Sequence, residues 1–289
     1  MSKIEACPIS GSRDLIETDY RLRDSESHRV LYCPESQHTF LDSFEHLNAD
    51  YFVNDKFLLS KPLAQGFDQR IRHFEAENQE RVQRIGPMLV NKRVMEFGCG
   101  AGALMQKIAP LVDSVEAVEK TSSFRTRLMA EGYTVHNDLS EAEGEFDAIL
   151  MFHVVEHLTD PVETLKECYA RLKPGGFLYV EVPNINDALL SLYEVSEYRE
   201  FHFFLDHLHY FSRFSLGLAF KNAGIANVTI AGHSRFSLAN HLYWLKSGKP
   251  GGHNVWNFLE TPSVKQEYAR SLAALDKSDS LIAQARRTE

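Results

Sequence analysis

Residues 94–104 of this chain read Val94-Met95-Glu96-Phe97-Gly98-Cys99-Gly100-Ala101-Gly102-Ala103-Leu104. An apolar run leads into the acidic Glu96, glycines follow at alternate positions, and a helix is expected to begin after them. Glycine lets the backbone approach a ligand closely and adopt dihedral angles that other residues avoid. The first turn of a helix leaves N–H groups free for polar ligand atoms. The stretch therefore predicts a nucleotide-type site at the carboxyl end of the first strand of a parallel sheet.

Two classes of ligand use such a turn. The pattern Gly98-x-Gly100-x-x-Ala103 also satisfies the fingerprint of dinucleotide-binding proteins, so an NAD-dependent dehydrogenase is one hypothesis. Glu96 stands two residues before the first glycine and favours a different ligand, because its carboxylate would repel a pyrophosphate. A carboxylate suits a ligand that carries an amino group and a positive sulfur. S-adenosylmethionine (SAM) is such a ligand.

The composition is that of an ordinary globular protein, with 289 residues of which 44% are hydrophobic and 25% charged. The formal net charge of −9 argues against non-specific binding to nucleic acid or anionic membranes, because phosphate contact needs clustered Lys and Arg. No apolar run has the length of a membrane span, and the polar start MSKIEACPIS does not match a signal peptide. We therefore expect a cytoplasmic protein with no membrane span and no nucleic-acid partner.

From residue 92 onward, strand-like and helix-like segments alternate. Strands are expected at residues 93–97, 114–119, 133–136, 146–152, 177–182 and 226–231, and helices at 102–111, 122–131, 161–172 and 214–223. Strands separated by helices at this spacing predict a doubly wound α/β fold with a mostly parallel sheet. Residues 235–245 fit either an edge strand or a helix, and residues 263–286 are expected to be mostly helical.

Four motifs, taken in order, resemble those of the class I SAM-dependent methyltransferases over residues 92–232. They are Glu96-x-Gly98-x-Gly100-x-Gly102, Val118-Glu119-Lys120, the loop Phe152-His153-Val154-Val155-Glu156-His157-Leu158-Thr159-Asp160-Pro161, and Leu172-Lys173-Pro174-Gly175-Gly176. Glu119 follows the glycines by about twenty residues, the spacing that brings a carboxylate to a ribose diol. The resemblance implies a Rossmann-like methyltransferase core that uses SAM and releases S-adenosylhomocysteine.

The resemblance also implies roles for single residues. Glu96 would lie near the amino group of SAM, and Glu119 would bind both ribose hydroxyls. Asp138 would accept a hydrogen bond from the adenine amino group, unless it only caps a turn. The implied cofactor-binding residues are Glu96, Gly98, Cys99, Gly100, Gly102, Glu119, Lys120, Asp138, Leu139, Phe152 and His153, with Leu139 on the adenine ring and the last two near the sulfonium.

The segment Phe204-Leu205-Asp206-His207-Leu208-His209-Tyr210-Phe211-Ser212 is similar to one found in bacterial sugar methyltransferases. By this resemblance His207 is the general base, Asp206 orients it or binds substrate, and His157 supports it. Histidine titrates near neutrality, which suits it to removing a proton from a weakly acidic hydroxyl. Phe204 stands where the nucleotide-sugar C-methyltransferases carry tyrosine, so we expect O-methylation.

The N-terminus resembles the zinc knuckle of the same enzymes in a degenerate form. The two motifs read Cys7-Pro8-Ile9-Ser10-Gly11 and Cys33-Pro34-Glu35-Ser36, with serine in place of the second cysteine of each pair. Serine is a poor zinc ligand and a structural site needs four good ligands, so we expect the metal to be lost. The expected organisation is a knuckle-like segment at 1–45, a helical lid or lead-in at 46–91, the methyltransferase core at 92–245, and a C-terminal loop and helical extension at 246–289.

A second metal hypothesis concerns the loop after the fourth strand. His153 and His157 are four residues apart, so one helical turn would place them on one face beside Glu156. Glu156-His157 also recurs in the resembled family as part of this loop, and we expect no metal.

The predicted function is SAM-dependent O-methylation of a sugar, either nucleotide-activated or bound to a surface glycan, as in polysaccharide biosynthesis. The alternatives are methylation of a non-sugar small metabolite, such as a quinone precursor, and a non-catalytic SAM-binding module.

Overall fold

The computed structural model describes residues 3–47, 51 and 67–288, and the chain forms two compact units. Unit 1 comprises Met1–Phe44, Val155–Thr164 and Glu181–Ala283. Unit 2 comprises Glu45–Val154, Leu165–Val180 and Gln284–Glu289. Part of the expected lid at 46–91, residues 48–50 and 52–66, lies outside the described residues.

A seven-stranded sheet forms the α/β core, with the strand order β10-β11-β8-β7-β4-β5-β6. The pairs β4–β5, β4–β7 and β5–β6 are parallel. The seven strands are β4 (Arg93–Phe97), β5 (Ser114–Val118), β6 (Thr134–His136), β7 (Phe146–Phe152), β8 (Leu172–Pro183), β10 (Val228–His233) and β11 (Ser280–Arg286). This architecture confirms the predicted doubly wound α/β fold.

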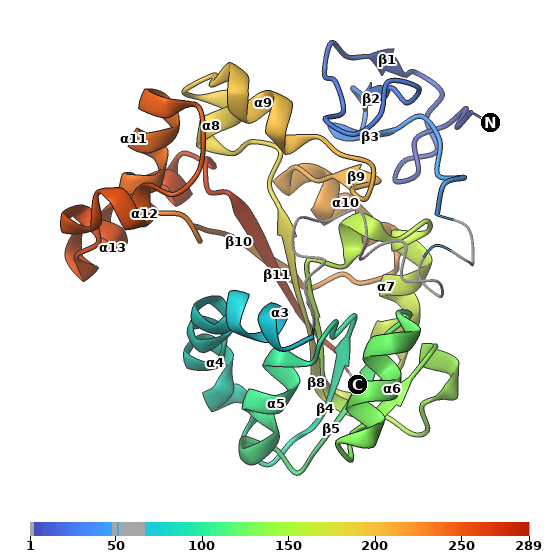
Figure 1. Ribbon diagram of the computed structural model, residues 1–289. Coiled ribbons are helices and arrows are strands. Elements are labelled where there is room, and N and C mark those ends of the chain that lie inside the picture. The colour runs from blue at the N-terminus through green and yellow to red at the C-terminus, as the bar shows by residue number, and fades with distance from the viewer. Residues whose placement is uncertain (1–2, 48–50, 52–66, 289) are drawn as a thin grey trace. The chain divides into compact units, whose positions relative to one another are not determined.

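Helices of unit 2 pack beside these strands, as Figure 1 shows for α5 and α6 next to β4 and β5. A buried cluster joins these elements to the glycine-rich turn, which contributes Cys99; its members are Cys99, Met105, Ala117, Leu128 and Val135. The helical elements from residue 67 to 170 are α3 (Phe67–His73), α4 (Glu75–Leu89), α5 (Ala103–Ile108), η1 (Ala109–Leu111), α6 (Ser122–Ala130), η2 (Leu139–Glu141), η3 (Val155–His157) and α7 (Pro161–Ala170).

Unit 1 contains a second, antiparallel sheet with the order β1-β2-β3-β9. Three of its strands come from the N-terminus, namely β1 (Ile16–Glu17), β2 (Val30–Cys33) and β3 (His38–Leu41), and the fourth is β9 (His209–Tyr210). Thr39 pairs with Tyr210, and Phe40 pairs with His209. The N-terminal segment is therefore built into the same sheet as the histidine-rich segment.

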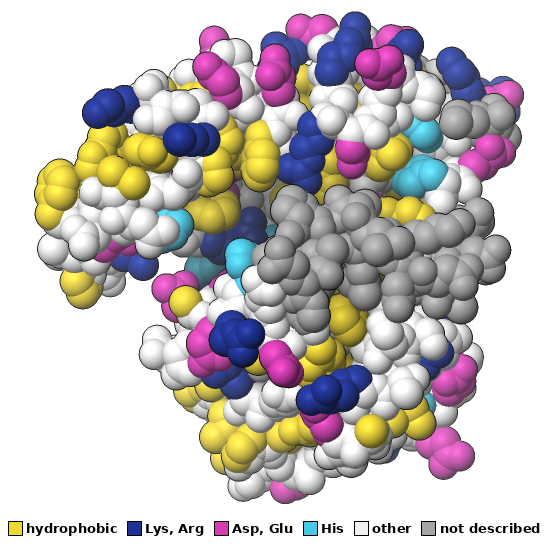
Figure 2. Space-filling view, viewed as in Figure 1, with side chains coloured by type: hydrophobic (Ala, Val, Ile, Leu, Met, Phe, Trp, Pro, Cys, Tyr) yellow, Lys and Arg dark blue, Asp and Glu magenta, His cyan; other side chains and the backbone are white. Residues whose placement is uncertain are grey.

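The remaining helices of unit 1 follow β8 in the chain. They are α8 (Ala188–Ser191), α9 (Ser196–His202), α10 (Arg213–Asn222), α11 (Leu238–Ser247), α12 (Gly252–Val255), η4 (Asn257–Leu259) and α13 (Pro262–Ala274). Ala239 and Trp244 of α11 are buried, whereas Leu242 and Leu245 are exposed. Figure 2 shows apolar side chains gathered on the surface of this helical region. No helix within the described ranges is both long and apolar enough to cross a bilayer.

Two local predictions differ from the structure. The helix expected at 161–172 ends at Ala170, and the strand expected at 177–182 begins earlier, at Leu172, so that β8 includes the Lys-Pro-Gly-Gly stretch. The helical C-terminus ends at Ala274, and residues 280–286 form β11 between β10 and β8. The expected C-terminal extension of loop and helix thus ends in a strand of the central sheet. The sequence does contain a strand signal here, because the apolar residues Leu281, Ala283 and Ala285 stand at alternate positions. In the structure all three are buried.

Candidate functional site

The turn between β4 and α5 depends on its glycines. Gly98, Gly100 and Gly102 all have positive φ, at 79°, 55° and 74°. A Cβ on Gly98 would lie 2.5 Å from Cγ2 of Val154, and one on Gly102 would lie 2.5 Å from Cδ2 of Leu128. A Cβ on Gly100 would have no atom of the described residues within 4 Å. Gly98 and Gly102 therefore permit close packing, while Gly100 leaves room for a ligand against the backbone.

Glu119, at the end of β5, holds this turn. Its Oε2 accepts a hydrogen bond from the Gly100 N–H at 2.7 Å, and its Oε1 accepts one from the Thr121 N–H at 2.7 Å. The carboxylate is buried, and this burial raises the pKa of Glu119 above its ordinary value. The Thr121 side chain also donates to this carboxylate, and the two oxygens have four acceptor positions in all, so the group can still accept a hydrogen bond from a ligand hydroxyl.

Glu96, on β4, is the second buried acid of the turn. Its Oε2 is buried and has no hydrogen-bond partner among the residues that the structure describes. Burial raises the pKa of Glu96 to about 8, although the nearby Arg81 acts in the opposite direction. An unpaired buried carboxylate oxygen is costly, and a ligand ammonium group would pair with it. Glu96, Glu119 and the open side of Gly100 thus fit the amino group and ribose of SAM.

Glu96→Gln is expected to stabilise the cofactor-free protein at pH 8 and to change little at pH 5. The pKa of Glu96 is about 8 in the folded protein, against 4.5 as its ordinary value, so its stabilising contribution is complete below pH 4.5 and is lost as the pH rises to about 8. Glutamine does not ionise and avoids this loss. Thermal unfolding should show a gain of about 3 °C or more at pH 8. A gain of equal size at both pH values would contradict the assignment, and the exposed Glu143→Gln serves as the control.

The residues of the predicted adenine site are linked to one another by hydrogen bonds in the structure. Lys120 Nζ donates to Asp138 Oδ2 at 2.9 Å, and Asp138 Oδ1 accepts from the Ser140 N–H at 3.1 Å, which caps η2. Hydrogen bonds from Lys120 and then Ser140 lower the pKa of Asp138 to about 2. Asp138 is therefore ionised and acts as the turn cap, while its carboxylate stays half exposed. Leu139 and Cys99 are buried; burial raises the pKa of the Cys99 thiol, which belongs to the core cluster.

Phe152 and His153 end strand β7. Phe152 contacts the ring of Tyr179 at a centroid distance of 5.7 Å, and the Arg81 guanidinium lies 4.5 Å from its centroid. His153 has a φ of 54°, an uncommon value for a residue other than glycine, which is enriched at functional sites. The next helical turn, η3, begins only at Val155, so the expected helical pairing of His153 with His157 does not form.

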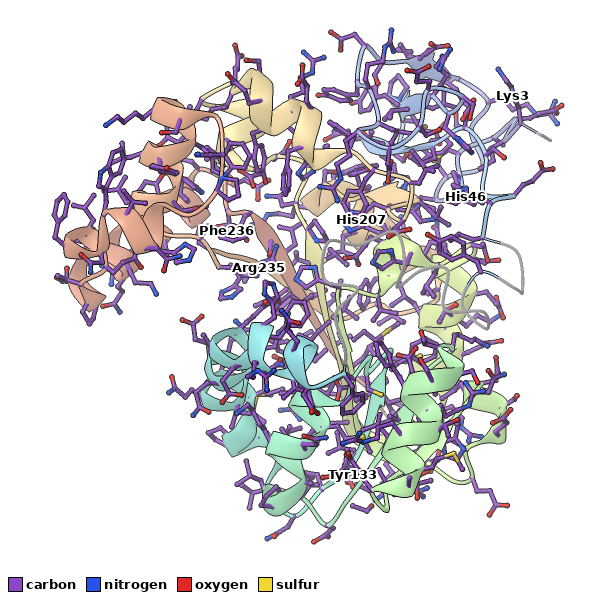
Figure 3. The ribbon with its side chains drawn as sticks, in the orientation of Figure 1. Lys3, His46, Tyr133, His207, Arg235 and Phe236 are labelled. Carbon is purple, nitrogen blue, oxygen red and sulfur yellow. The ribbon has the colours of Figure 1, made fainter. Side chains whose placement is uncertain are left out.

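A histidine cluster, defined here as Glu156, His157 and His207, lies within unit 1. The ligand atoms of all three side chains lie within 4.8 Å of one another. His207, labelled in Figure 3, lies in the loop between α9 and β9, and its ring centroid is 4.9 Å from that of His157. The structure therefore brings the neighbouring residues Glu156 and His157 together with His207, which is distant in the chain.

Backbone hydrogen bonds fix this cluster. His157 Nδ1 donates to the Asp206 carbonyl at 2.5 Å, and the Leu208 N–H donates to the Glu156 carbonyl at 2.9 Å. Because a carbonyl can only accept, Nδ1 of His157 carries a proton, and in the neutral imidazole the lone pair then lies on Nε2. Asp206, predicted to orient His207, thus orients His157 through its carbonyl.

The loop that carries His207 is held by residues that the sequence did not single out for this role. The Tyr210 hydroxyl accepts from the Phe204 N–H at 3.0 Å and donates to the Phe204 carbonyl at 3.1 Å. The Phe204 ring lies 4.0 Å from the His207 ring, and the Leu205 N–H donates to Asp24 Oδ1 at 3.0 Å. No local sequence signal links Asp24 to a loop so distant in the chain.

His209 is a structural residue. Its Nε2 donates to the Leu158 carbonyl at 2.9 Å, and its Nδ1 accepts from His38 Nε2 at 2.9 Å. Burial lowers the pKa of His209 to about 3, so the residue is neutral. His38 Nε2 is therefore used in a hydrogen bond to His209.

The four knuckle positions lie together although two are serines. Cys7 Sγ is 3.2 Å from Ser36 Oγ, and Ser10 Oγ is 3.5 Å from Cys33 Sγ. Burial opposes ionisation of Cys33, but hydrogen bonds with Ser36, Ser10 and Cys7 lower its pKa overall. Hydrogen bonds thus link the four side chains at the positions that the sequence compares with a zinc knuckle.

The double variant Ser10→Cys/Ser36→Cys is expected to bind one equivalent of Zn²⁺ and to unfold at a higher temperature in its presence. Four clustered thiolates form a closed structural zinc site, and zinc bound only by the folded state stabilises it. Metal content after purification and thermal unfolding with and without a chelator would measure both effects. The two single variants, with three thiols each, are the matched controls. Zinc content equal to that of the natural sequence would show that the four positions cannot close around a metal.

A comparison of the chain with known protein families agrees with the geometry of the glycine turn and its two acids. A family model described as a methyltransferase domain matches residues 70–230, more than half of the chain. The chain belongs to this family. Within it, the protein has the class I SAM-dependent methyltransferase fold.

Relatives of this methyltransferase-family protein are similar over part of its length. It is 32% identical over 139 residues to the ubiquinone biosynthesis O-methyltransferase of Caulobacter vibrioides, which covers 44% of this chain and 53% of the relative. The chain thus spans about half the length of the curated relatives it matches. A SAM-dependent methyltransferase structure from Archaeoglobus fulgidus is 16% identical with a TM-score of 0.51, covering 80% of this chain and 99% of the other. One from Thermotoga maritima is 17% identical with a TM-score of 0.50, covering 76% and 95%. These structures share the fold.

Proposed function

We propose that this protein is a SAM-dependent O-methyltransferase that acts on the hydroxyl group of a small molecule. The glycine turn with its two buried acids, Glu96 and Glu119, is the observation that carries the proposal. Membership of the methyltransferase-domain family supports it. SAM, when bound, supplies a methyl group on a positively charged sulfur, which is a good leaving group.

Different residues of the proposed site bind different parts of SAM. Glu96 pairs its buried Oε2 with the ammonium group, and Glu119 binds the ribose diol at the acceptor position that Gly100 and Thr121 do not use. Asp138 and Leu139 are the proposed adenine contacts, the first through its half-exposed carboxylate. Phe152 and His153, at the end of β7, are proposed to lie near the reacting sulfur. Such positioning supplies a large part of the rate of an in-line transfer.

The acceptor hydroxyl loses its proton at the histidine cluster, with His207 as the base. A neutral imidazole removes a proton from a weakly acidic hydroxyl best when its own pKa lies near the working pH. His157, oriented by the Asp206 carbonyl, and Asp206 are the supporting residues. The two hydrogen bonds between the Tyr210 hydroxyl and the Phe204 backbone hold the loop that carries His207.

The proposed acceptor is a phenolic or other hydroxylated metabolite. This choice is supported by the relatives, whose names describe O-methylation in ubiquinone biosynthesis. A sugar hydroxyl is the second candidate. It is favoured by one structural observation: the knuckle-like segment and the acid-histidine segment, the two features that resemble sugar methyltransferases, belong to one sheet.

The test uses the purified protein and SAM labelled in its methyl group. Catechols and hydroxylated benzoates form one acceptor panel, and nucleotide sugars and glycan fractions form the other. Label in the phenols supports the main proposal, and label only in the carbohydrates supports the second candidate. Binding of S-adenosylhomocysteine without transfer to either panel or to a cell extract would point to a non-catalytic SAM-binding protein.

A further inference from the structure

We infer that Glu156, His157 and His207 bind a divalent transition-metal cation. The ligand atoms of these three side chains lie within 4.8 Å of one another. Atoms bound to one cation at about 2.1 Å lie about 3.4 Å apart in tetrahedral geometry, so a pair at the full 4.8 Å would need to close by about 1.4 Å. This arrangement differs from the sequence-based expectation of no metal, and it includes His207 in place of His153.

The cluster is organised before any cation binds. His157 donates its Nδ1–H to the Asp206 carbonyl at 2.5 Å, which leaves Nε2 as the ligand atom. A hydrogen bond from the second ring nitrogen to a carbonyl is the usual support of a metal-bound histidine. The Leu208 N–H donates to the Glu156 carbonyl and His209 Nε2 donates to the Leu158 carbonyl, each at 2.9 Å. These bonds hold the two chain segments that carry the ligands against each other.

The donor set indicates which cation is favoured. Two imidazoles and one carboxylate suit Zn²⁺, Mn²⁺, Co²⁺ or Fe²⁺, whereas Ca²⁺ and Mg²⁺ prefer sites made of oxygen ligands. Glu156 is fully buried, so its carboxylate lies at the side of the cluster that is shielded from solvent. His157 and His207 are partly exposed, so solvent can reach the cluster. Three protein ligands leave coordination positions for water or for a substrate oxygen.

Cation binding does not depend on the proposed function, but it would change the role of His207 within it. The acceptor hydroxyl would bind the cation, and coordination would lower its pKa so that its proton passes to solvent water. His207 would then act as a ligand. The oxygen–methyl bond forms as the methyl–sulfur bond breaks, and no electron is gained or lost.

The experiment measures binding without turnover. The full-length protein is stripped with EDTA, exchanged into metal-free buffer, and titrated with Mn²⁺ by electron paramagnetic resonance and with Zn²⁺ by calorimetry. We expect one saturable site for the natural sequence. Glu156→Gln and His207→Ala are each expected to weaken binding at least about tenfold. His253→Ala, an exposed histidine on α12, is the matched control.

Two further variants and a second ligand keep the outcomes distinct. His157→Gln and His207→Gln preserve side-chain volume better, and circular dichroism shows whether each variant is folded. No saturable site in the natural sequence, or equal binding by folded Glu156→Gln and His207→Ala, would overturn the inference. If no saturable site is found and methyl transfer proceeds at full rate in excess EDTA, the proposed function stands with His207 as the base and the inference fails. If the cation binds but no acceptor is methylated, the inference stands and the proposed function fails.

Discussion

His207→Ala is expected to lower kcat/KM for methyl transfer by about 10³-fold, while the dissociation constant of SAM changes less than about threefold. The loss follows because the acceptor hydroxyl has to give up its proton as it attacks, and His207 is the proposed recipient. We expect SAM affinity to be retained because His207 is not among the proposed SAM-binding residues, which include the glycine turn, Glu96 and Glu119. Steady-state kinetics with labelled SAM, paired with calorimetry on S-adenosylhomocysteine, measures both quantities.

The matched control for this variant is His253→Ala, which removes an exposed imidazole from α12 and should leave both quantities unchanged. The assignment of His207 is wrong if folded His207→Ala retains full activity. A parallel loss of SAM binding and activity would instead indicate that the substitution disturbs the fold. Tyr210 and Phe204, which hold the loop around His207, would be the first places to look for such a disturbance.

Glu119→Ala is expected to weaken SAM binding by about 10² to 10³-fold. The carboxylate accepts hydrogen bonds from the Gly100 and Thr121 N–H groups at 2.7 Å, and it is the proposed acceptor for the ribose diol. Alanine removes these bonds together and leaves two buried backbone donors unpaired. Glu119→Gln keeps one acceptor oxygen and should give an intermediate affinity. Calorimetric titration with SAM measures all three proteins.

Glu143→Ala, at an exposed position before β7, is the control and should bind SAM as tightly as the natural sequence. An unchanged affinity in folded Glu119→Ala would show that Glu119 only braces the glycine turn. A lower melting temperature together with normal SAM affinity at low temperature would lead to the same conclusion. Either result would leave Glu96 as the principal acid of the cofactor site.

Much of the α/β core could be predicted because its signals are local. The continuous apolar run Phe146–Phe152 is a strand with the predicted bounds, and Arg93–Phe97 is another. Apolar periodicity and turn residues report on neighbours in the chain, which is why these elements were found. The strand Ser280–Arg286 was missed because it follows a helical pattern, and because its pairing with β8 and β10 joins residues distant in the chain.

The sequence by itself determined the fold class, the glycine turn and the two acids beside it, Glu96 and Glu119. Each of these is encoded within a single strand–turn–helix unit, where conformational preference and side-chain alternation act over a few residues. Only the tertiary structure decided that Glu156 and His157 meet His207, that strand β9 pairs with β3, and that Cys7 lies beside Ser36. These contacts join residues far apart in the chain, and they depend on sheet register and packing, for which no local pattern exists.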